Sequence, residues 1–102
     1  MAAANDNRKT QIINNLKNNF SGVINVPTIY SNIDVLTNEK IIIVKELNNW
    51  MDGIGILTLQ TSFFPNKQKH LHIYNINDNN NDELNKIISA TNTLNIALTI
   101  EQ

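Results

Sequence analysis

Two charged side chains beside an apolar run are the first candidates for chemistry. Asp34 lies within "NIDVLT" at 32–37, and Lys45 ends the apolar run at 41–44. Both segments have the alternating apolar pattern of strands, so a carboxylate and an ammonium group fall on neighbouring strands. Such a pair serves either catalysis or structure. In the structural reading, Asp34 caps a turn or forms an ion pair with Lys45.

A short basic segment is the second candidate. Lys67, Lys69 and His70 follow Asn66, and lysines contact phosphates without reading base sequence, so the segment predicts a nucleic-acid contact. A solvated strand entry is the structural alternative. His70 and His72 would share one face of a strand and could supply two metal ligands. No third ligand is evident and cysteine is absent, so we interpret both as histidines of the sheet.

Length and composition limit the class of protein. We expect 102 residues to form a single domain, residues 1–102, with an ordered core from about 8 to 100 and a flexible segment at 1–7. No apolar run approaches the roughly 18 residues of a membrane span, and "MAAANDNRKT" lacks a signal-peptide core. We therefore expect no membrane contact and a cytoplasmic location, in the host cytoplasm or nucleus if the protein is viral.

The charge and the lack of cysteine exclude several chemistries. A chain without cysteine has no disulfides, no thiol catalysis and no cysteine-ligated zinc, and it fits a reducing compartment. The formal net charge of −1 provides no overall attraction to a polyanion, so any nucleic-acid contact needs a local basic patch. No feature indicates a small-molecule cofactor.

The apolar periodicity predicts alternating helices and strands. A helix is expected at about 8–19, capped by Asp6, and the next segments read as strands at 23–26, 32–37 and 40–45, with a tight turn at Asn38 and Glu39. A helix at about 49–63, containing Gly53 and Gly55, a strand at 70–76, a helix led by Asp82 and a strand at 95–100 follow. We predict an α/β fold of order α-β-β-β-α-β-α-β, with a mixed sheet of about five strands and a parallel crossover. The two glycines suggest close packing of that helix against a neighbour.

The order of these elements and the residues at 29–76 resemble the PD-(D/E)XK, or restriction-endonuclease-like, superfamily, and in particular small domains of large DNA viruses. Members carry an "R-I-D-I-L-T" strand, an "E-I-I-E-V-K" strand and a "W-x-x-A-I-G-Q" helix, which match "NIDVLT", "KIIIVK" and the segment after Trp50. The resemblance implies a metal-dependent nuclease fold, in which acids on two adjacent strands hold Mg²⁺ and a lysine polarises water and phosphate.

Matched by position, the resemblance makes Asp34 the metal-binding aspartate and Lys45 the lysine. The second acid of the motif falls at Ile43, and the supporting glutamine of the helix falls at Ile56. Two polar positions have become isoleucine, which indicates a pocket filled as part of the core. Asp52 lies four residues before Ile56 on the same helical face and is the candidate for a migrated acid.

We therefore expect a catalytically inactive nuclease-like domain, a pseudoenzyme that acts by binding nucleic acid or protein, encoded by a virus. Two alternatives stay open. One is a structural or assembly subunit, as a homodimer or within a larger complex, with the final strand as an available edge. The other is a metal-dependent nuclease with a rearranged site of Asp34, Asp52 and Lys45, in which case Asp34 would bind Mg²⁺. No cofactor is expected if the site is inactive.

Overall fold

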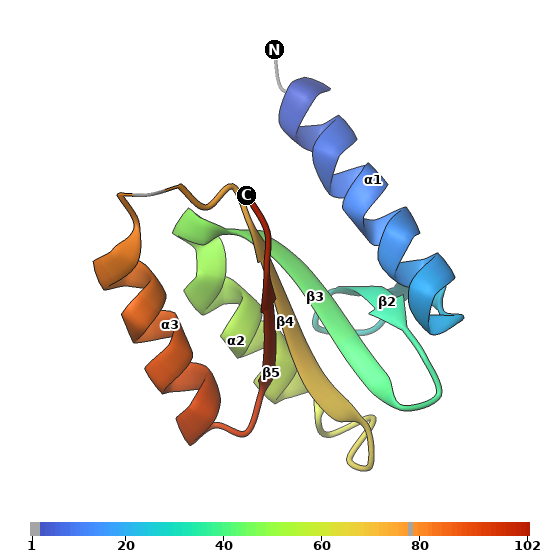
Figure 1. The fold of residues 1–102 in the computed structure, drawn as a ribbon. Helices are drawn as coiled ribbons and strands as arrows, with labels where there is room; N and C mark the ends of the chain where they lie inside the picture. Colours follow the sequence, from blue (N-terminus) through green and yellow to red (C-terminus); the bar gives the residue numbers. More distant parts are fainter. Residues whose placement is uncertain (1–2, 78) are drawn as a thin grey trace.

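The computed structural model describes residues 3–77 and 79–102, and its element order agrees with the prediction (Figure 1). The elements are α1 (Ala3–Phe20), β1 (Val23–Pro27), β2 (Asn32–Leu36), β3 (Lys40–Glu46), the 3-10 turn η1 (Leu47–Asn49), α2 (Trp50–Gln60), β4 (Gln68–Tyr74), α3 (Asn81–Thr93) and β5 (Ala97–Ile100). The fold is α/β, with one sheet and three α-helices in these residues.

The five strands form one mixed sheet in the order of the chain, β1-β2-β3-β4-β5. β1, β2 and β3 form an antiparallel meander, and β4 and β5 are added parallel to β3. Parallel neighbours need long crossovers, and α2 and α3 provide them. β1 and β5 are the two edges, so the prediction that the final strand is an edge is confirmed.

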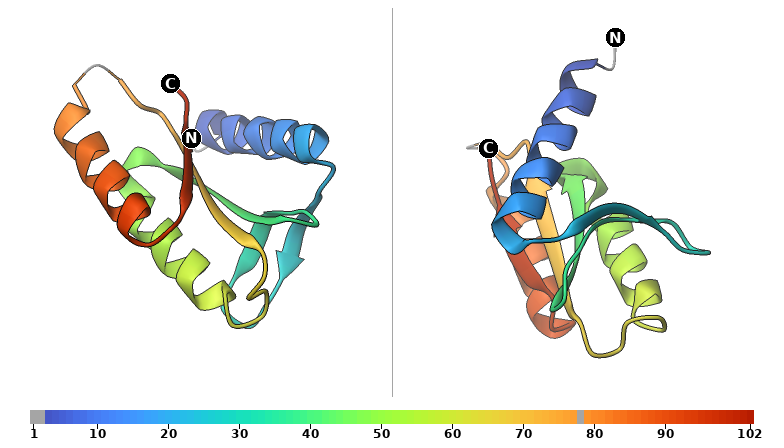
Figure 2. Two further views of the ribbon diagram at one scale, coloured as in Figure 1. Left: turned by 60° about the horizontal axis from the view of Figure 1, so that its bottom comes forward. Right: turned by 90° about the vertical axis from the view of Figure 1, so that its right-hand side faces the viewer.

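Helices cover both faces of the sheet, with α1 on one face and α2 and α3 on the other (Figure 2). Alternate residues of β3 point to the two sides: Ile42 and Val44 pack with Ile12, Ile13 and Leu16 of α1. Ile41 and Ile43 join the larger core beneath α2 and α3, which includes Trp50, Leu57, Leu71, Ile73 and Ile87. A continuous apolar run in β3 therefore reflects a strand that is buried on both faces.

Several boundaries differ from the prediction. α1 begins at Ala3, so residues 3–7 are helical where a flexible segment was expected, and Asp6 lies inside the helix instead of capping it. The alanines at its start have the highest helix propensity. β4 begins two residues earlier than predicted, because its parallel register with β3 starts at the pair of Lys40 and Gln68.

The two glycines of α2 have different surroundings. A Cβ on Gly53 would lie 2.5 Å from Leu71 Cδ1 and 3.1 Å from Lys45 Cγ, so the predicted close packing is confirmed there. A Cβ on Gly55 would meet no atom within 4 Å, so the prediction is wrong for that glycine. Among the described helices, none combines the length and apolar character that crossing a bilayer requires.

Candidate functional site

Asp34 joins β2 to β3 where their main-chain pairing ends. The ladder pairs Val35 with Ile42 and Leu36 with Ile41. At the preceding residue, Asp34, a side chain makes the connection between the strands in place of the main chain. Its Oδ2 accepts a hydrogen bond from the Val44 amide at 2.7 Å. The carboxylate thus satisfies a main-chain donor that a neighbouring strand would otherwise satisfy.

The environment of Asp34 disfavours its charge. Burial raises the pKa of this carboxyl above its ordinary value, and the Val44 hydrogen bond and the charges of Lys9 and Lys45 counteract only part of that effect. Within the described part of the chain, no ion pair of 4.0 Å or less joins Asp34 to a lysine. The two lysines act on it through their charge at a distance.

The other two members of the rearranged site do not close around Asp34. Lys45 is half-buried, and its aliphatic stem lies against Gly53 at the start of α2. Asp52 is exposed in the first turn of α2 and makes no hydrogen bond or ion pair with another described residue. The structure therefore brings Lys45 into electrostatic range of Asp34, while it leaves Asp52 facing solvent.

The positions of the second acid and of the glutamine are occupied by core side chains. Ile43 is 1% exposed within the core beneath α2, and Ile56 is half-buried against the same core. Across residues 3–77 and 79–102, no three histidine or acidic side chains are grouped to hold a metal ion. The donor set around Asp34 does not fit Mg²⁺, which usually relies on more than one acidic ligand or on substrate phosphates.

The basic segment divides between surface and interior. Lys67 Nζ donates to the carbonyl oxygens of Thr37 and Asn38, at 2.7 and 2.9 Å, so it holds the β2–β3 turn. Lys69 is half-buried beside a hollow of about 350 Å³ that Lys67 also lines. His70 does not accompany them at the surface, because its side chain is 1% exposed and packs edge-on against the Phe20 ring.

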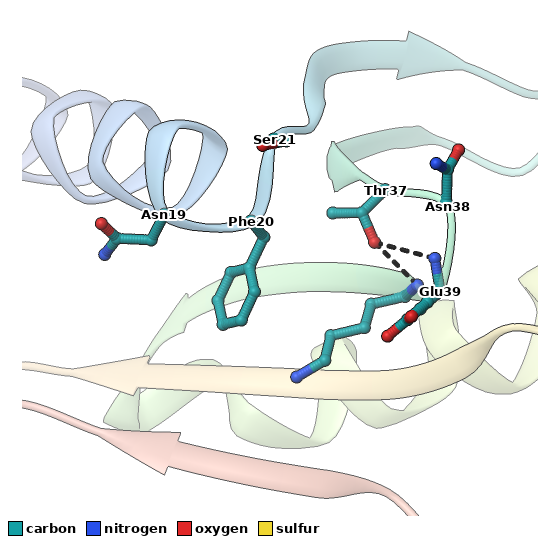
Figure 3. Close-up of a pocket in the computed structure, with 7 residues that line it drawn as sticks. Asn19, Phe20, Ser21, Thr37, Asn38 and Glu39 are labelled. Atoms are coloured by element: carbon teal, nitrogen blue, oxygen red, sulfur yellow. Dashed lines mark hydrogen bonds between the residues drawn. The ribbon is translucent and has the colours of Figure 1, made fainter.

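A hollow of about 330 Å³ separates the end of α1 from the β2–β3 turn (Figure 3). Asn19, Phe20 and Ser21 line one side, and Thr37, Asn38, Glu39 and Lys40 line the other. Thr37 Oγ1 accepts hydrogen bonds from the amides of Glu39 and Lys40, at 3.1 and 2.9 Å, which fix the turn. Lys40 is not recognisable as a site residue from the sequence, because its proximity to Phe20 and His70 depends on packing between distant segments.

Both predicted sheet histidines belong to a hydrogen-bonded chain on the α1 face. His70 Nε2 lies 2.8 Å from Thr99 Oγ1, and the same hydroxyl lies 2.6 Å from His72 Nδ1. His72 Nε2 lies 2.7 Å from Glu101 Oε1, and Arg8 reaches Glu101 at 3.6 Å. Thr99 of β5 and Glu101 just after it thus provide hydrogen-bond partners for the two imidazoles, and Arg8 of α1 contacts only Glu101.

The donors of this chain can be assigned. Lys40 Nζ lies 3.5 Å from His70 Nδ1, and an ammonium group only donates, so Nδ1 accepts and the proton of neutral His70 is on Nε2. His70 then donates to Thr99, the Thr99 hydroxyl donates to His72 Nδ1, and His72 Nε2 donates to Glu101. Burial and the charge of Lys40 lower the pKa of His70 to about 4, which keeps it neutral.

Three proteins of Acanthamoeba polyphaga mimivirus, each named as a putative KilA-N domain-containing protein, are similar to this chain. One is 34% identical over 83 residues, which cover 81% of this chain and 34% of the relative. The second is 32% identical over 84 residues, 81% of this chain and 24% of the relative. The third is 31% identical over 85 residues, 83% of this chain and 23% of the relative.

The chain therefore spans about a third of the length of the first relative and about a quarter of the other two. The sequence predicts a resemblance to domains of large DNA viruses, and the similarity to these three viral proteins confirms that part of the prediction. No protein-family model matches the chain, and no solved structure matches it.

Proposed function

We propose that this domain is a catalytically inactive, nuclease-like module of viral ancestry that binds nucleic acid. One observation carries the loss of catalysis: the residue that replaces the second acid, Ile43, is part of the packed core. A carboxylate introduced there would be desolvated, and Asp34 is the only acidic residue on the neighbouring strand β2.

The environment of Asp34 supports the same proposal. A metal-binding carboxylate has to be ionised, whereas burial raises the pKa of Asp34 and its Oδ2 already accepts the Val44 hydrogen bond. In this proposal Asp34 connects two strands, and Lys45 keeps its position as a remnant of the motif. Binding to nucleic acid is supported by Lys67 and Lys69, which line one hollow at the start of β4.

Two assays on the purified chain test this proposal. Fluorescence anisotropy with labelled single-stranded and duplex DNA and RNA, between about 50 and 200 mM salt, measures binding and its salt dependence. Incubation of plasmid and single strands with Mg²⁺ or Mn²⁺ measures cleavage. We expect affinity that falls as salt rises, and intact substrates.

Metal-dependent cleavage that Asp34→Ala abolishes would overturn catalytic inactivity and favour the rearranged nuclease. A chain that binds none of the four nucleic acids at 50 mM salt would overturn the binding role.

A second candidate function is assembly through β1 with a second copy of the chain. β1 is an edge strand, and Val23 is 57% and Ile24 36% exposed on its two faces. A second copy can pair with the Val23–Ile24 part of this edge by a two-fold axis, which would cover these side chains, while Asn25, with its positive φ, interrupts the regular strand beyond them. Light scattering at micromolar concentration should then give the mass of a dimer, and a strict monomer would exclude this candidate.

A further inference from the structure

One end of the molecule concentrates positive charge that the net charge of −1 conceals. We define the basic end as the last turn of α1, the β2–β3 turn and the start of β4, which meet at the base of the sheet (Figure 1). It holds Lys17, Lys40, Lys67 and Lys69 against a single acidic residue, Glu39. Its formal charge is +3, so the remaining residues, with a net charge of −1 for the whole chain, carry −4.

We propose that the basic end binds the phosphate backbone of a nucleic acid, with Lys40 as the direct phosphate contact in the hollow between α1 and the β2–β3 turn. This inference rests on the proposed function and names the place on the molecule where binding occurs. A dipolar charge distribution would also orient the domain as it approaches a polyanion.

Lys40 is a cation held by neutral groups. Its Nζ lies 4.5 Å from the centre of the Phe20 ring and 3.5 Å from His70 Nδ1. No carboxylate of a described residue lies within 4.0 Å of it. His70 stays neutral at physiological pH because its pKa is lowered to about 4, so the Lys40 charge has no counter-charge in direct contact. A bound phosphate would supply one.

The hollow beside Lys40 has the size for a phosphate group and a polar lining. Asn19, Ser21 and Asn38 contribute to that lining, with the amide ends of Asn19 and Asn38 directed outward from it (Figure 3). The volume of about 330 Å³ admits a phosphate with part of its sugar. Glu39 also lines the hollow, and its carboxylate opposes an anion there.

Lys67 acts differently from Lys40. Two of its three ammonium protons are used on the carbonyl oxygens of Thr37 and Asn38, so it is a positioning residue that holds the turn next to the hollow. Lys69 pairs with Ile41, so its side chain lies on the other face of the sheet from Lys40, where it lines the second hollow and adds to the charge of this end without contacting the same phosphate. Contacts that use such lysines carry no base specificity.

Variants that change one charge test the site. Lys40→Met removes the ammonium group but keeps an aliphatic chain against Phe20, and Lys86→Met removes an exposed lysine of α3 at a distance from the basic end. Glu39→Gln removes the opposing carboxylate, and Asp82→Asn makes the same change in net charge at the exposed start of α3. Anisotropy with labelled DNA and RNA at about 50 to 200 mM salt gives the affinity of each.

We expect Lys40→Met to weaken binding roughly five- to tenfold on every sequence and to reduce the slope of log affinity against log salt by about 1. Lys86→Met should leave both unchanged. Glu39→Gln should strengthen binding by more than Asp82→Asn does, and because Glu39 is exposed this comparison holds even if Lys40→Met fails to fold.

Two failures are distinguishable. If the unaltered chain binds and Lys40→Met equals Lys86→Met, or Glu39→Gln equals Asp82→Asn, the site is wrong and the proposed function stands. If the unaltered chain does not bind, the proposed function is wrong, and the site falls with it.

Discussion

The Asp34 carboxylate accepts a hydrogen bond from the Val44 amide at 2.7 Å, and this contact fixes the side chain that the nuclease motif would use for metal. It makes Asp34 a connector between β2 and β3. The raised pKa of Asp34 indicates that its ionised form is disfavoured by burial, while its oxygen is needed as the acceptor for the Val44 amide.

Asp34→Asn and Asp34→Ala should therefore differ in their effect on stability. Asparagine keeps an acceptor for Val44 and removes a partly buried charge, so we expect the free energy of unfolding to be unchanged or higher. Alanine leaves the Val44 amide without this acceptor and should lower the free energy of unfolding by about 1 to 3 kcal/mol. Urea unfolding of both variants measures the difference, and equal losses would show that the charge itself stabilises the fold.

Introducing the second acid of the nuclease motif should damage the core. Ile43→Glu places a carboxylate at a position that is 1% exposed, and we expect a loss of roughly 3 kcal/mol or more, with Ile43→Val as the control at about 1 kcal/mol. The double variant with Ile56→Gln should cleave no DNA with Mg²⁺. A stable double variant that does cleave would establish the nuclease ancestry and show that the pocket accepts its former residues.

Gly53 and Gly55 provide a matched pair on α2. Gly53→Ala would drive a methyl group to 2.5 Å from Leu71 Cδ1, in the packed core, so we expect a lower free energy of unfolding. Gly55→Ala meets open space and should raise it by about 0.5 to 1 kcal/mol through helix propensity. Thermal denaturation of the two variants checks the signs, and a stabilised Gly53→Ala would mean that α2 is free to move away from the sheet.

The element order was predictable because apolar periodicity is local. Ile41 to Val44 form a continuous apolar run in a strand that is buried on both faces, and the parallel crossover followed from a helix between two strands. Trp50 is buried in the same core, and its indole nitrogen also donates to Glu83 of α3 at 2.6 Å.

The site was harder to predict because its parts are distant in sequence. Lys40 stands at the start of a strand, and only the sheet register and the end of α1 place it beside Phe20 and His70. The bridge from Thr99 to two histidines depends on a parallel pairing that the residue pattern does not specify. The sequence also could not show that Gly53 is closely packed and Gly55 is not, because the difference comes from side chains of neighbouring strands that lie against Gly53 only.

Stability should fall as pH falls from about 6.5 toward 4. His70 has an ordinary pKa of 6.5 and a folded-state pKa of about 4, because burial and Lys40 oppose its charge. Below pH 6.5 the unfolded chain binds a proton that the folded chain does not, so the stability present above 6.5 is progressively lost, by up to roughly 3 kcal/mol near pH 4.

This loss is measured best between pH 7 and 5, where most carboxylates remain ionised. His70→Gln removes the titrating group and should give a flatter curve of unfolding free energy over that range. The NMR shift of the His70 ring in the unaltered chain should titrate with a midpoint near 4. A midpoint near 6.5 would remove the basis of this prediction.

Thr99 should be the residue on which the two buried histidines most depend. Its hydroxyl accepts from His70 Nε2 and donates to His72 Nδ1, and it does so from the edge strand β5. Thr99→Val keeps the shape and the β-branched backbone preference but leaves one buried donor and one buried acceptor without their partner. We expect the free energy of unfolding to fall by about 2 kcal/mol, the lower end of the roughly 1 to 3 kcal/mol that each of the two groups would cost if fully buried, because Thr99 itself is exposed.

Thr99→Ser is the control, because it retains the hydroxyl and should cost less than about 1 kcal/mol. Hydrogen exchange separates this local effect from a general loss of stability: amides of β5 should exchange faster in Thr99→Val, while the protection of β2 and β3 changes only with the global free energy of unfolding. If Thr99→Val and Thr99→Ser are equally stable, water replaces the Thr99 hydroxyl as the partner of the two imidazoles. The hydrogen bonds that connect Lys40 to Glu101 through the two histidines would then contribute nothing to the attachment of β5 to the sheet.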